Sequence, residues 1–530
     1  MTLQDQKLDK LISLIKDSFR VREDHDPIYV DLGGHLERIA ADQHQVIFGR
    51  RGSGKSCLLV HYHRRARPKT TLSIYVSADE IKRLGYPDLL IRLLISLLSG
   101  FPDGAGDRLR GLVPFLRTAG QRQVAELRAL LDRAERADVT EKNARVRDRT
   151  LGGSAPAGPG SVTGEYHAGT TQQRTSAFVE EKLDTLERHL QDYKQTLREV
   201  LERSEYDRAT FFVDDFYLVH PDVQPDVIDY LHRLVRGTRA YLKIGTVRHR
   251  TSLARYDGGQ TIGIELYQDA EAINLDQTFE DINATHNYLA SMLDSMGAQA
   301  GIENVSRTHL SQDGLFQLTL ASGGVPRDYL NIFVEAIQIA RELGHTKWLT
   351  PTTVYKGAYR IMRRTKLVNL RDDVGADAAR LERVYQRLLN FCLRERRKTA
   401  FLISEDEATA AVAEHELVQQ LMDFKLIHVV EPDTSAASGR PGRYEAYTLD
   451  FAFFMEPRRR NIEIVKFWEK DENRRRRGIR ESPVFELAQL AGLEEAPLDE
   501  QTEEFVEEID AETAAPEAAP LTEDGFDDRI

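Results

Sequence analysis

A glycine-rich segment at residues 49–56, GRRGSGKS, carries the clearest chemical signal in the sequence. It fits the pattern G-x-x-x-x-G-K-[ST], in which glycines let main-chain N–H groups wrap around a phosphate and the following helix adds partial positive charge. Lys55 is then expected to reach the β- and γ-phosphates of a nucleotide, and the Ser56 hydroxyl to ligate Mg²⁺. The predicted nucleotide-binding residues of the loop are Gly49, Arg50, Arg51, Gly52, Ser53, Gly54, Lys55, Ser56 and Cys57.

Two acids end a strongly apolar strand predicted at 210–215, TFFVDD. In a parallel sheet the carboxyl ends of the strands face the ligand crevice. Asp214 is therefore placed to hold Mg²⁺ through water, and Asp215 to orient or deprotonate an attacking water. The alternative is a pair of acids that caps the strand or the next helix.

Two further residues are candidates for contact with the phosphates. Thr246 ends the strand predicted at 241–246, and its hydroxyl could touch the γ-phosphate or the attacking water; taken alone, it is better explained as an ordinary strand-end threonine. Arg327 opens a helix directly after GGVP, and an arginine there could reach the phosphates from a separate subdomain. A surface ion pair is the competing interpretation of Arg327.

The elements that must position these residues alternate between strands and helices. Such an alternation predicts an α/β protein with a parallel sheet and crossover helices. A short helix is expected at 5–19, and a long helical stripe at 176–203 has heptad-like spacing, for which packing on its own domain is favoured over an intermolecular coiled coil. The predicted strands cover residues 46–48, 71–77, 210–215, 241–246 and 272–275.

The C-terminal third changes character. Two helical stretches and a β-hairpin with a long Gly/Ser/Pro tip outline a winged helix. Residues 481–530 hold 17 acids and one arginine, which gives this block a net charge of −16. The whole chain has a formal net charge of −13, so the other 480 residues sum to +3. An acidic block of this kind is expected to be disordered, because it cannot bury enough apolar surface to fold alone.

Together these motifs resemble the AAA+ ATPases, particularly the branch of origin-recognition and archaeal initiator proteins. The phosphate loop looks like Walker A, FFVDD like Walker B, the end of YLKIGT like sensor 1, and GGVPR like a sensor 2 on a helical lid. The resemblance implies ATP and Mg²⁺ as cofactors, an ATP hydrolase, a homo-oligomer in which a neighbour supplies an arginine finger, and Tyr29 in the place where the family packs adenine. Arg248, Arg250 and Arg255, just after sensor 1, are the nearest finger candidates.

The resulting domain organisation combines the motifs with the resemblance. A P-loop parallel sheet with a helical lid is followed by a winged helix and a disordered acidic tail. The predicted parts are an N-terminal helix at 1–24, an AAA+ core at 25–277 with a helical insertion at about 100–205 and a flexible linker at 151–171, a lid at 278–370, a winged helix at 376–455, a basic segment at 456–480 and the tail at 481–530.

Three functions fit the sequence. The first is an ATP-driven AAA+ switch that assembles on DNA or a partner protein in replication, transposition or defence against foreign DNA. The second is a signalling ATPase that recruits an effector, since the Asp214–Asp215 pair replaces the usual Asp-Glu and is similar to the STAND ATPases. The third is a winged-helix DNA-binding regulator with a structural nucleotide.

The expected partners and compartment follow from charge and composition. DNA is expected to contact the winged helix and the basic segment, and a protein partner the acidic tail or the helical insertion. Two distant cysteines, Cys57 and Cys392, exclude a four-thiolate zinc site and a secreted disulfide framework. The most apolar run, residues 89–101, is too short to span a bilayer, so we expect a cytoplasmic protein without a membrane segment.

Overall fold

The computed structural model of the chain divides into two compact units. Unit 1 comprises Met1–Arg364 together with the short segments Asp423–His428 and Asp450–Pro457, and unit 2 comprises the remainder from Thr365 onward. Each unit is described by itself. The structure describes residues 2–19, 29–31, 33–66, 69–100, 120–132, 164–204, 206–361, 366, 378–437, 439–453 and 462–493.

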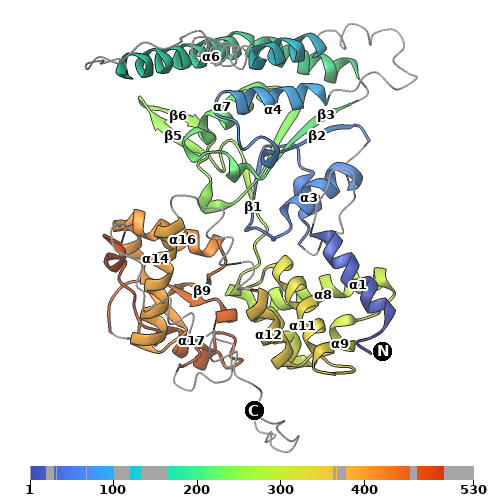
Figure 1. The fold of residues 1–530 in the computed structure, drawn as a ribbon, viewed down its shortest axis with the longest axis vertical. Coiled ribbons are helices and arrows are strands. Elements are labelled where there is room, and N and C mark those ends of the chain that lie inside the picture. Colours follow the sequence, from blue (N-terminus) through green and yellow to red (C-terminus); the bar gives the residue numbers. More distant parts are fainter. Residues whose placement is uncertain are drawn as a thin grey trace, which may run out of the picture. The chain divides into compact units, whose positions relative to one another are not determined.

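The centre of unit 1 is a parallel sheet of five strands in the order β2-β3-β4-β1-β7 (Figure 1). All five strands match the apolar runs predicted from the sequence to within two residues; β1 to β4 are buried along most of their length, whereas β7 has one buried residue, Ile273. Their bounds are β1 Gln45–Phe48, β2 Thr71–Ser77, β3 Arg208–Asp214, β4 Ala240–Thr246 and β7 Glu271–Asn274. The order places β1, which leads into the phosphate loop, between β4 and β7.

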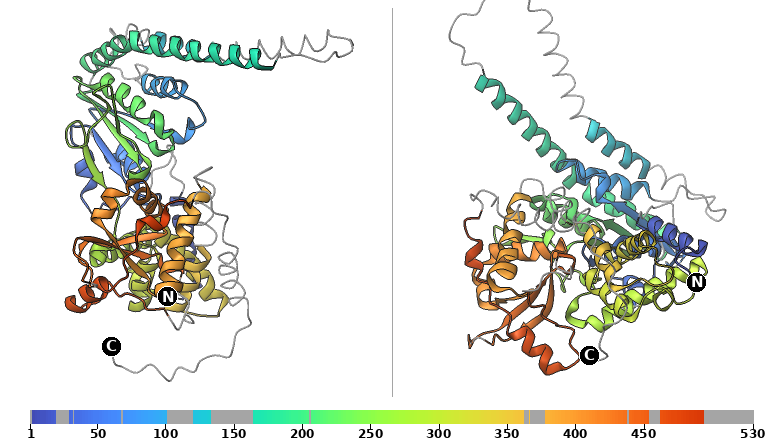
Figure 2. Two further views of the ribbon diagram at one scale, coloured as in Figure 1. Left: turned by 90° about the vertical axis from the view of Figure 1, so that its left-hand side faces the viewer. Right: turned by 60° about the horizontal axis from the view of Figure 1, so that its bottom comes forward.

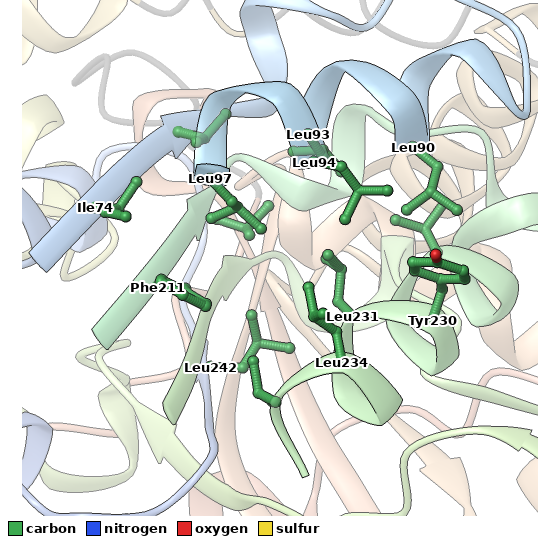
Figure 3. Packing of buried hydrophobic residues seen from close by; sticks show 14 of the residues in the cluster. Ile74, Leu90, Leu93, Leu94, Leu97, Phe211, Tyr230, Leu231, Leu234 and Leu242 are labelled. Atoms are coloured by element: carbon green, nitrogen blue, oxygen red, sulfur yellow. The ribbon is translucent and has the colours of Figure 1, made fainter. Parts of the chain in front are cut away.

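Helices cover both faces of this sheet. On one face α4 (Asp88–Ser99) and α7 (Gln224–Val235) pack leucines and Tyr230 onto apolar side chains of the strands, as Figure 3 shows for Leu93, Leu231 and Phe211. On the other face α2 (His35–Ile39) and α3 (Lys55–His61) form a smaller cluster. The loop before α3 is thus held between two packed layers.

The helical insertion is built around α6 (Gly164–Arg203), the long helix of Figure 2. The apolar stripe of α6 packs within unit 1, which is the interpretation that the sequence analysis favoured over an intermolecular coiled coil. Leu186, Leu190 and Leu197 are buried in the same core as α7. The predicted linker at 151–171 is wrong over residues 164–171, which belong to α6 because the helix continues toward its N-terminus beyond the apolar stripe; residues 151–163 lie outside the described residues. A further helix at 120–132 contacts α6 through Gln123, whose side-chain amide donates to Thr196 (2.8 Å).

Along the chain, a pair of short strands that the sequence analysis did not predict lies between β4 and β7. The hairpin β5 (Ala254–Asp257) and β6 (Gln260–Gly263) is short and mostly exposed, so it lacks the apolar run from which the other strands were predicted.

The lid follows as a group of helices in unit 1. The predicted break at GGVP is present, because Gly323 (φ +61°) and Gly324 (φ +76°) adopt left-handed conformations between α10 and α11. The N-terminal helix α1 (Gln6–Ser18) packs on α8. The lid helices are α8 Ile282–Ala300, α9 Val305–Thr308, α10 Gln312–Ala321, α11 Pro326–Glu342 and α12 Pro351–Ile361.

Unit 2 has the element order of a winged helix, with one strand that the sequence interpretation missed. Its antiparallel sheet has the order β8-β10-β9, and the missed strand is β8, a five-residue run that follows a basic stretch. Strands β9 and β10 form the predicted hairpin. The elements are α14 Ala378–Leu389, β8 Ala400–Ser404, α15 Glu405–Ala410, α16 Val412–Asp423, β9 Ile427–Thr434, β10 Tyr444–Leu449 and α17 Glu472–Arg480.

The sequence analysis predicted that the acidic tail starts at residue 481, and the structure shows that this boundary is too early. Phe485, Leu487 and Leu490 are buried, and the N–H of Phe485 donates to the carbonyl of Leu402 in β8 (2.8 Å). The apolar side chains that lie between the acids give this segment a surface that can be buried. The charge of residues 481–530, counted as one block, does not reveal these side chains. Residues 494–530 lie outside the described residues. Across the described ranges, every helix is too short or too polar to cross a bilayer.

Candidate nucleotide-binding site

The phosphate loop joins β1 to α3 at the carboxyl edge of the sheet. The N–H of Gly49 donates to the carbonyl of Thr246 in the neighbouring strand (3.1 Å), and the N–H of Leu58 donates to Gly54 (2.9 Å), which starts the helix. Gly52 and Gly54 have φ values of +93° and +102°, which residues with a Cβ rarely adopt. At Gly54 a Cβ would meet no atom within 4 Å, so the backbone conformation and not the available space requires glycine there.

Lys55 is buried inside this loop. Its Nζ donates to the carbonyl oxygen of Gly49 (2.6 Å), so the loop itself holds the ammonium group. Burial lowers the pKa of Lys55, and the carboxylates of Asp214, Asp215 and Asp276 act in the opposite direction. An ammonium group surrounded by carboxylates and main-chain oxygens is suited to exchanging these partners for phosphate oxygens.

Asp214 and Asp215 lie close enough to Lys55 for their charges to act on its pKa. Asp214 is fully buried, and its two oxygens accept hydrogen bonds from the Tyr75 hydroxyl (2.7 Å) and from the N–H of Asp215 (2.8 Å). Burial, followed by the charge of Asp214, raises the pKa of Asp215 to about 6. Asp215 also has a left-handed backbone (φ 52°), an uncommon conformation that is often found at functional sites.

Thr246 ends β4 beside β1, where its carbonyl accepts the hydrogen bond from Gly49. Its hydroxyl is bonded to the Thr251 hydroxyl (2.5 Å). The geometry therefore shows a main-chain link between Thr246 and the loop, with the side chain engaged by a neighbour.

Arg327 lies against the phosphate loop. Its N–H donates to the carbonyl of Gly52 (3.2 Å), and a Cβ on Gly52 would approach the Cβ of Arg327 to 2.8 Å. Nη2 of the guanidinium donates to the carbonyl of Phe19 (3.4 Å), and the charge of Arg327 acts to lower the pKa of both Lys55 and Cys57. The start of α11 and the loop are therefore in direct main-chain contact.

Tyr29 and Cys57 lie near each other beside α3, since the charge of Cys57 contributes to the raised pKa of Tyr29. The Tyr29 ring is 5.9 Å from that of His61, and burial raises its pKa, with Tyr288 of α8 and Asp31 adding to the effect. Burial also raises the pKa of the Cys57 thiol to about 11. The half-buried Tyr29 ring therefore packs beside the last residue of α3.

Two observations in the loop fit a phosphate ligand and its Mg²⁺. The Ser53 hydroxyl is buried and contacts no hydrogen-bond partner among the described residues, so a donor is left for a phosphate oxygen. Ser56 is the second residue of α3, directly after Lys55, and the carboxylate of Asp214 lies near Lys55. In the described part of the chain, no group of three or more His, Cys, Asp or Glu side chains is arranged to hold a metal by itself, so Ser56, Asp214 and the phosphates would have to share the ion.

Several residues of the site were missing from the sequence interpretation. Tyr75 belongs to β2 and binds Asp214, while Asp276 follows β7 and accepts a hydrogen bond from the N–H of Arg50 (2.8 Å). Tyr75 lies two residues before the end of β2 and Asp276 two residues after the end of β7, so their place near the carboxyl edge could have been inferred from the strand predictions. Their partners could not, because pairing depends on the strand order.

This geometry defines the class of protein to which the chain belongs. A parallel sheet with helices on both faces, a glycine-rich loop after β1 and two acids at the end of β3 make a P-loop nucleotide-binding fold.

Comparisons with known proteins give no narrower family. No family model and no curated protein matches the chain. Among solved structures, it is similar to the ORC1 protein of Aeropyrum pernix in complex with DNA (13% identity, 83% of this chain and 93% of that one, TM-score 0.35). It is also similar to the ORC2 protein of Aeropyrum pernix (12%, 82% and 94%, 0.35) and to a Walker-type ATPase of Pyrococcus abyssi (11%, 83% and 99%, 0.38). TM-scores this low carry no argument about function, which rests on the chain's own geometry.

Proposed function

We propose that the protein is an ATP-binding and ATP-hydrolysing switch of the AAA+ type that assembles on DNA. The observation that carries the proposal is the convergence of Lys55, the Asp214–Asp215 pair and Arg327 on one glycine-rich loop. Three elements far apart in sequence supply these groups, and their charges are those that phosphoryl transfer requires.

Each group has a role in the proposed hydrolysis. Lys55 would exchange the Gly49 carbonyl for β- and γ-phosphate oxygens. Asp214 and Ser56 would hold Mg²⁺, which when bound neutralises charge on the phosphates. Asp215, whose raised pKa of about 6 leaves it mostly ionised at pH 7, would orient or deprotonate the water. Arg327 would sense the phosphates from the start of α11.

The test is ATP turnover measured with and without DNA, beside mass photometry for the oligomeric state. Magnesium-dependent turnover that Lys55→Ala abolishes is the expected result. Wild-type turnover in Lys55→Ala would show that this loop is not the site.

An oligomer with an arginine finger belongs to the same proposal. Of the three candidates, Arg255 forms an ion pair with Asp226, and Arg248 stacks over the Phe48 ring (4.3 Å). Arg250 lies over the ring of Tyr217 (4.8 Å). A finger from this group would have to exchange these contacts on assembly, so the substitution Arg248→Ala should lower turnover only in the oligomer.

The DNA contact of unit 2 is proposed for the wing and α17. Arg474, Arg476 and Arg477 of α17 have side chains that are 77, 70 and 78% exposed. The wing is the segment between β9 and β10. The N–H of Ala437 in the wing donates to the carbonyl of Arg480 at the end of α17 (2.7 Å), so α17 and the wing are adjacent. These arginines pair with Asp471, Glu472 and Glu481, so phosphates would have to replace carboxylates and binding should depend strongly on salt.

Helix α16 does not support the usual winged-helix contact. Residues 405–422, which cover α15 and α16 up to the buried Asp423, hold five acids and no lysine or arginine. Such a surface repels phosphates. It favours a protein partner instead, so a signalling ATPase that recruits an effector through unit 2 is the second candidate function.

Charge reversal separates the two candidates. The triple variant Arg474→Glu, Arg476→Glu and Arg477→Glu should weaken DNA binding severalfold and reduce its salt dependence. The control changes the three exposed lysines of α1, Lys7, Lys10 and Lys16, to glutamate, with the same change in net charge. Equal DNA affinity in the two triple variants would remove α17 from the DNA contact, and the absence of DNA binding by the wild type would favour the second candidate.

A further inference from the structure

Arg50, a variable position of the phosphate-loop pattern, has a buried side chain with several hydrogen-bond partners. It is 7% exposed, and its Nε donates to Asp276 (3.4 Å) after β7. Its Nη2 donates to the carbonyl oxygens of Gln277 (2.9 Å) and Gly323 (3.3 Å). One guanidinium therefore joins the loop to the end of the sheet and to the turn that precedes α11.

The same guanidinium contacts a buried histidine. Nη1 of Arg50 lies 3.3 Å from Nδ1 of His428, and Nε2 of His428 lies 2.8 Å from a carboxylate oxygen of Asp450. Arginine can only donate, so Nδ1 must accept, and the ring proton is then on Nε2, where it donates to Asp450. His428 and Asp450 are 3% and 0% exposed, so water cannot substitute for either contact.

The surroundings are shaped to hold this ring. A Cβ on Gly323 would lie 2.1 Å from Cε1 of His428, so the glycine makes room for the imidazole. The Phe279 ring packs 5.2 Å from it. Nearby, Lys425 donates two hydrogen bonds to Asp328 (3.0 Å each), a buried ion pair next to Arg327 on α11.

His428, Lys425 and Asp450 all belong to the two short segments of unit 1 that come from the C-terminal part of the chain. Asp423 is the last residue of α16, His428 is the second residue of β9, and Asp450 directly follows β10. Any displacement of these segments is passed on covalently to the helix and the two strands that continue into unit 2.

We propose that Arg50 and the His428–Asp450 pair form a buried relay, through which occupancy of the phosphate loop sets the arrangement of segments 423–428 and 450–453. Arg50 is itself part of the phosphate loop, so a change in the shape of the loop when phosphate binds would move its backbone and stretch the bonds of its guanidinium to Gly323 and His428. In this relay His428 is a positioning residue, because it acts through Arg50. The proposal rests on nucleotide binding by the loop, as proposed above.

Hydrogen–deuterium exchange of the full chain, with and without a non-hydrolysable ATP analogue, tests the relay. In the wild type, the analogue should change the protection of peptides that cover 423–428 and 450–453. His428→Leu keeps the volume but has no polar atoms, and it should abolish that change while altering the affinity for the analogue by no more than about fivefold, the lower end of typical coupling factors.

Two variants keep the test decisive. His428→Gln offers one acceptor and one donor, so it should restore the exchange response even if His428→Leu folds poorly. Arg341→Ala is the matched control, because Arg341 also bonds a carbonyl, that of Leu3, and a carboxylate, that of Asp9, within unit 1; its response should equal the wild type's.

The outcomes separate the relay from the proposed function. A wild-type response that persists in His428→Leu overturns the relay, as does analogue binding by the wild type without any response in the two segments. A wild type that binds no analogue overturns the proposed function itself, and the relay with it.

Discussion

Asp423 allows a quantitative test of the buried polar surroundings of Arg50. It is 9% exposed, and its Oδ2 contacts no hydrogen-bond donor among the described residues. Burial, with the charge of Asp276 next, raises its pKa from 3.8 to about 7, although Arg50 and Arg250 act in the opposite direction. Keeping this carboxylate ionised in the folded protein is therefore costly.

The sign and size of the effect on the free energy of unfolding follow from the difference between the pKa of Asp423 in the folded and the unfolded protein. The folded protein holds this proton up to a higher pH than the unfolded chain, so the stability falls as the pH rises between the two pKa values of 3.8 and about 7. A shift of about three units at roughly 1.4 kcal/mol per unit gives an upper bound of about 4 kcal/mol above pH 7. At pH 5, about 1.6 kcal/mol of this cost is already present.

Asp423→Asn removes the ionisation at nearly constant volume. Urea denaturation at pH 5 and pH 8 should show a variant that is more stable than the wild type, with an advantage that is larger at pH 8 by about 2 to 3 kcal/mol at most. The control Asp17→Asn, at an exposed position of α1, should change little at either pH. A variant that is less stable than the wild type at pH 8 would refute the reasoning, because it would mean that the neighbouring arginines stabilise the ionised carboxylate.

Three further changes address the site and the C-terminus. Asp215→Asn should keep Mg-ATP bound, because Asp214 still serves the metal, and should lower turnover by at least about a hundredfold; loss of nucleotide in a binding titration would mean that the two roles are exchanged. Arg327→Ala should slow hydrolysis and weaken binding less than Lys55→Ala does, and unchanged kinetics in a steady-state assay would leave it a structural residue. Truncation after residue 493 should leave thermal stability and basal turnover unchanged and strengthen DNA binding most at low salt, since it removes 15 acids and one arginine. Truncation after residue 481 should destabilise unit 2 by several kcal/mol, because three buried apolar side chains are lost; equal melting curves for the two truncations would contradict the folded boundary.

The sequence was sufficient wherever one local pattern dominated. Buried parallel strands read as continuous apolar runs, which is why β1 to β4 and β7 were predicted closely. The glycine-rich loop could be recognised because its chemistry requires fixed residue types at fixed spacing. The hairpin β5–β6 was missed because it is mostly exposed and has no apolar run. Strand β8 does contain a buried apolar run, residues 400–403, but the run is short and follows a basic stretch, so it was not separated from the preceding helix.

Long-range pairing could not be obtained from the sequence. Nothing local indicates that Tyr75 binds Asp214, or that Arg50 meets a histidine 378 residues further along the chain. The partners of Phe485 were hidden in the same way, because the acids around it dominate the composition. The sequence by itself determined the phosphate loop, its acids and the alternating elements that carry them, since these depend on residue type and spacing. Only the tertiary structure decided which side chains brace the loop and where the folded part of unit 2 ends, because contacts between distant residues depend on strand order and packing.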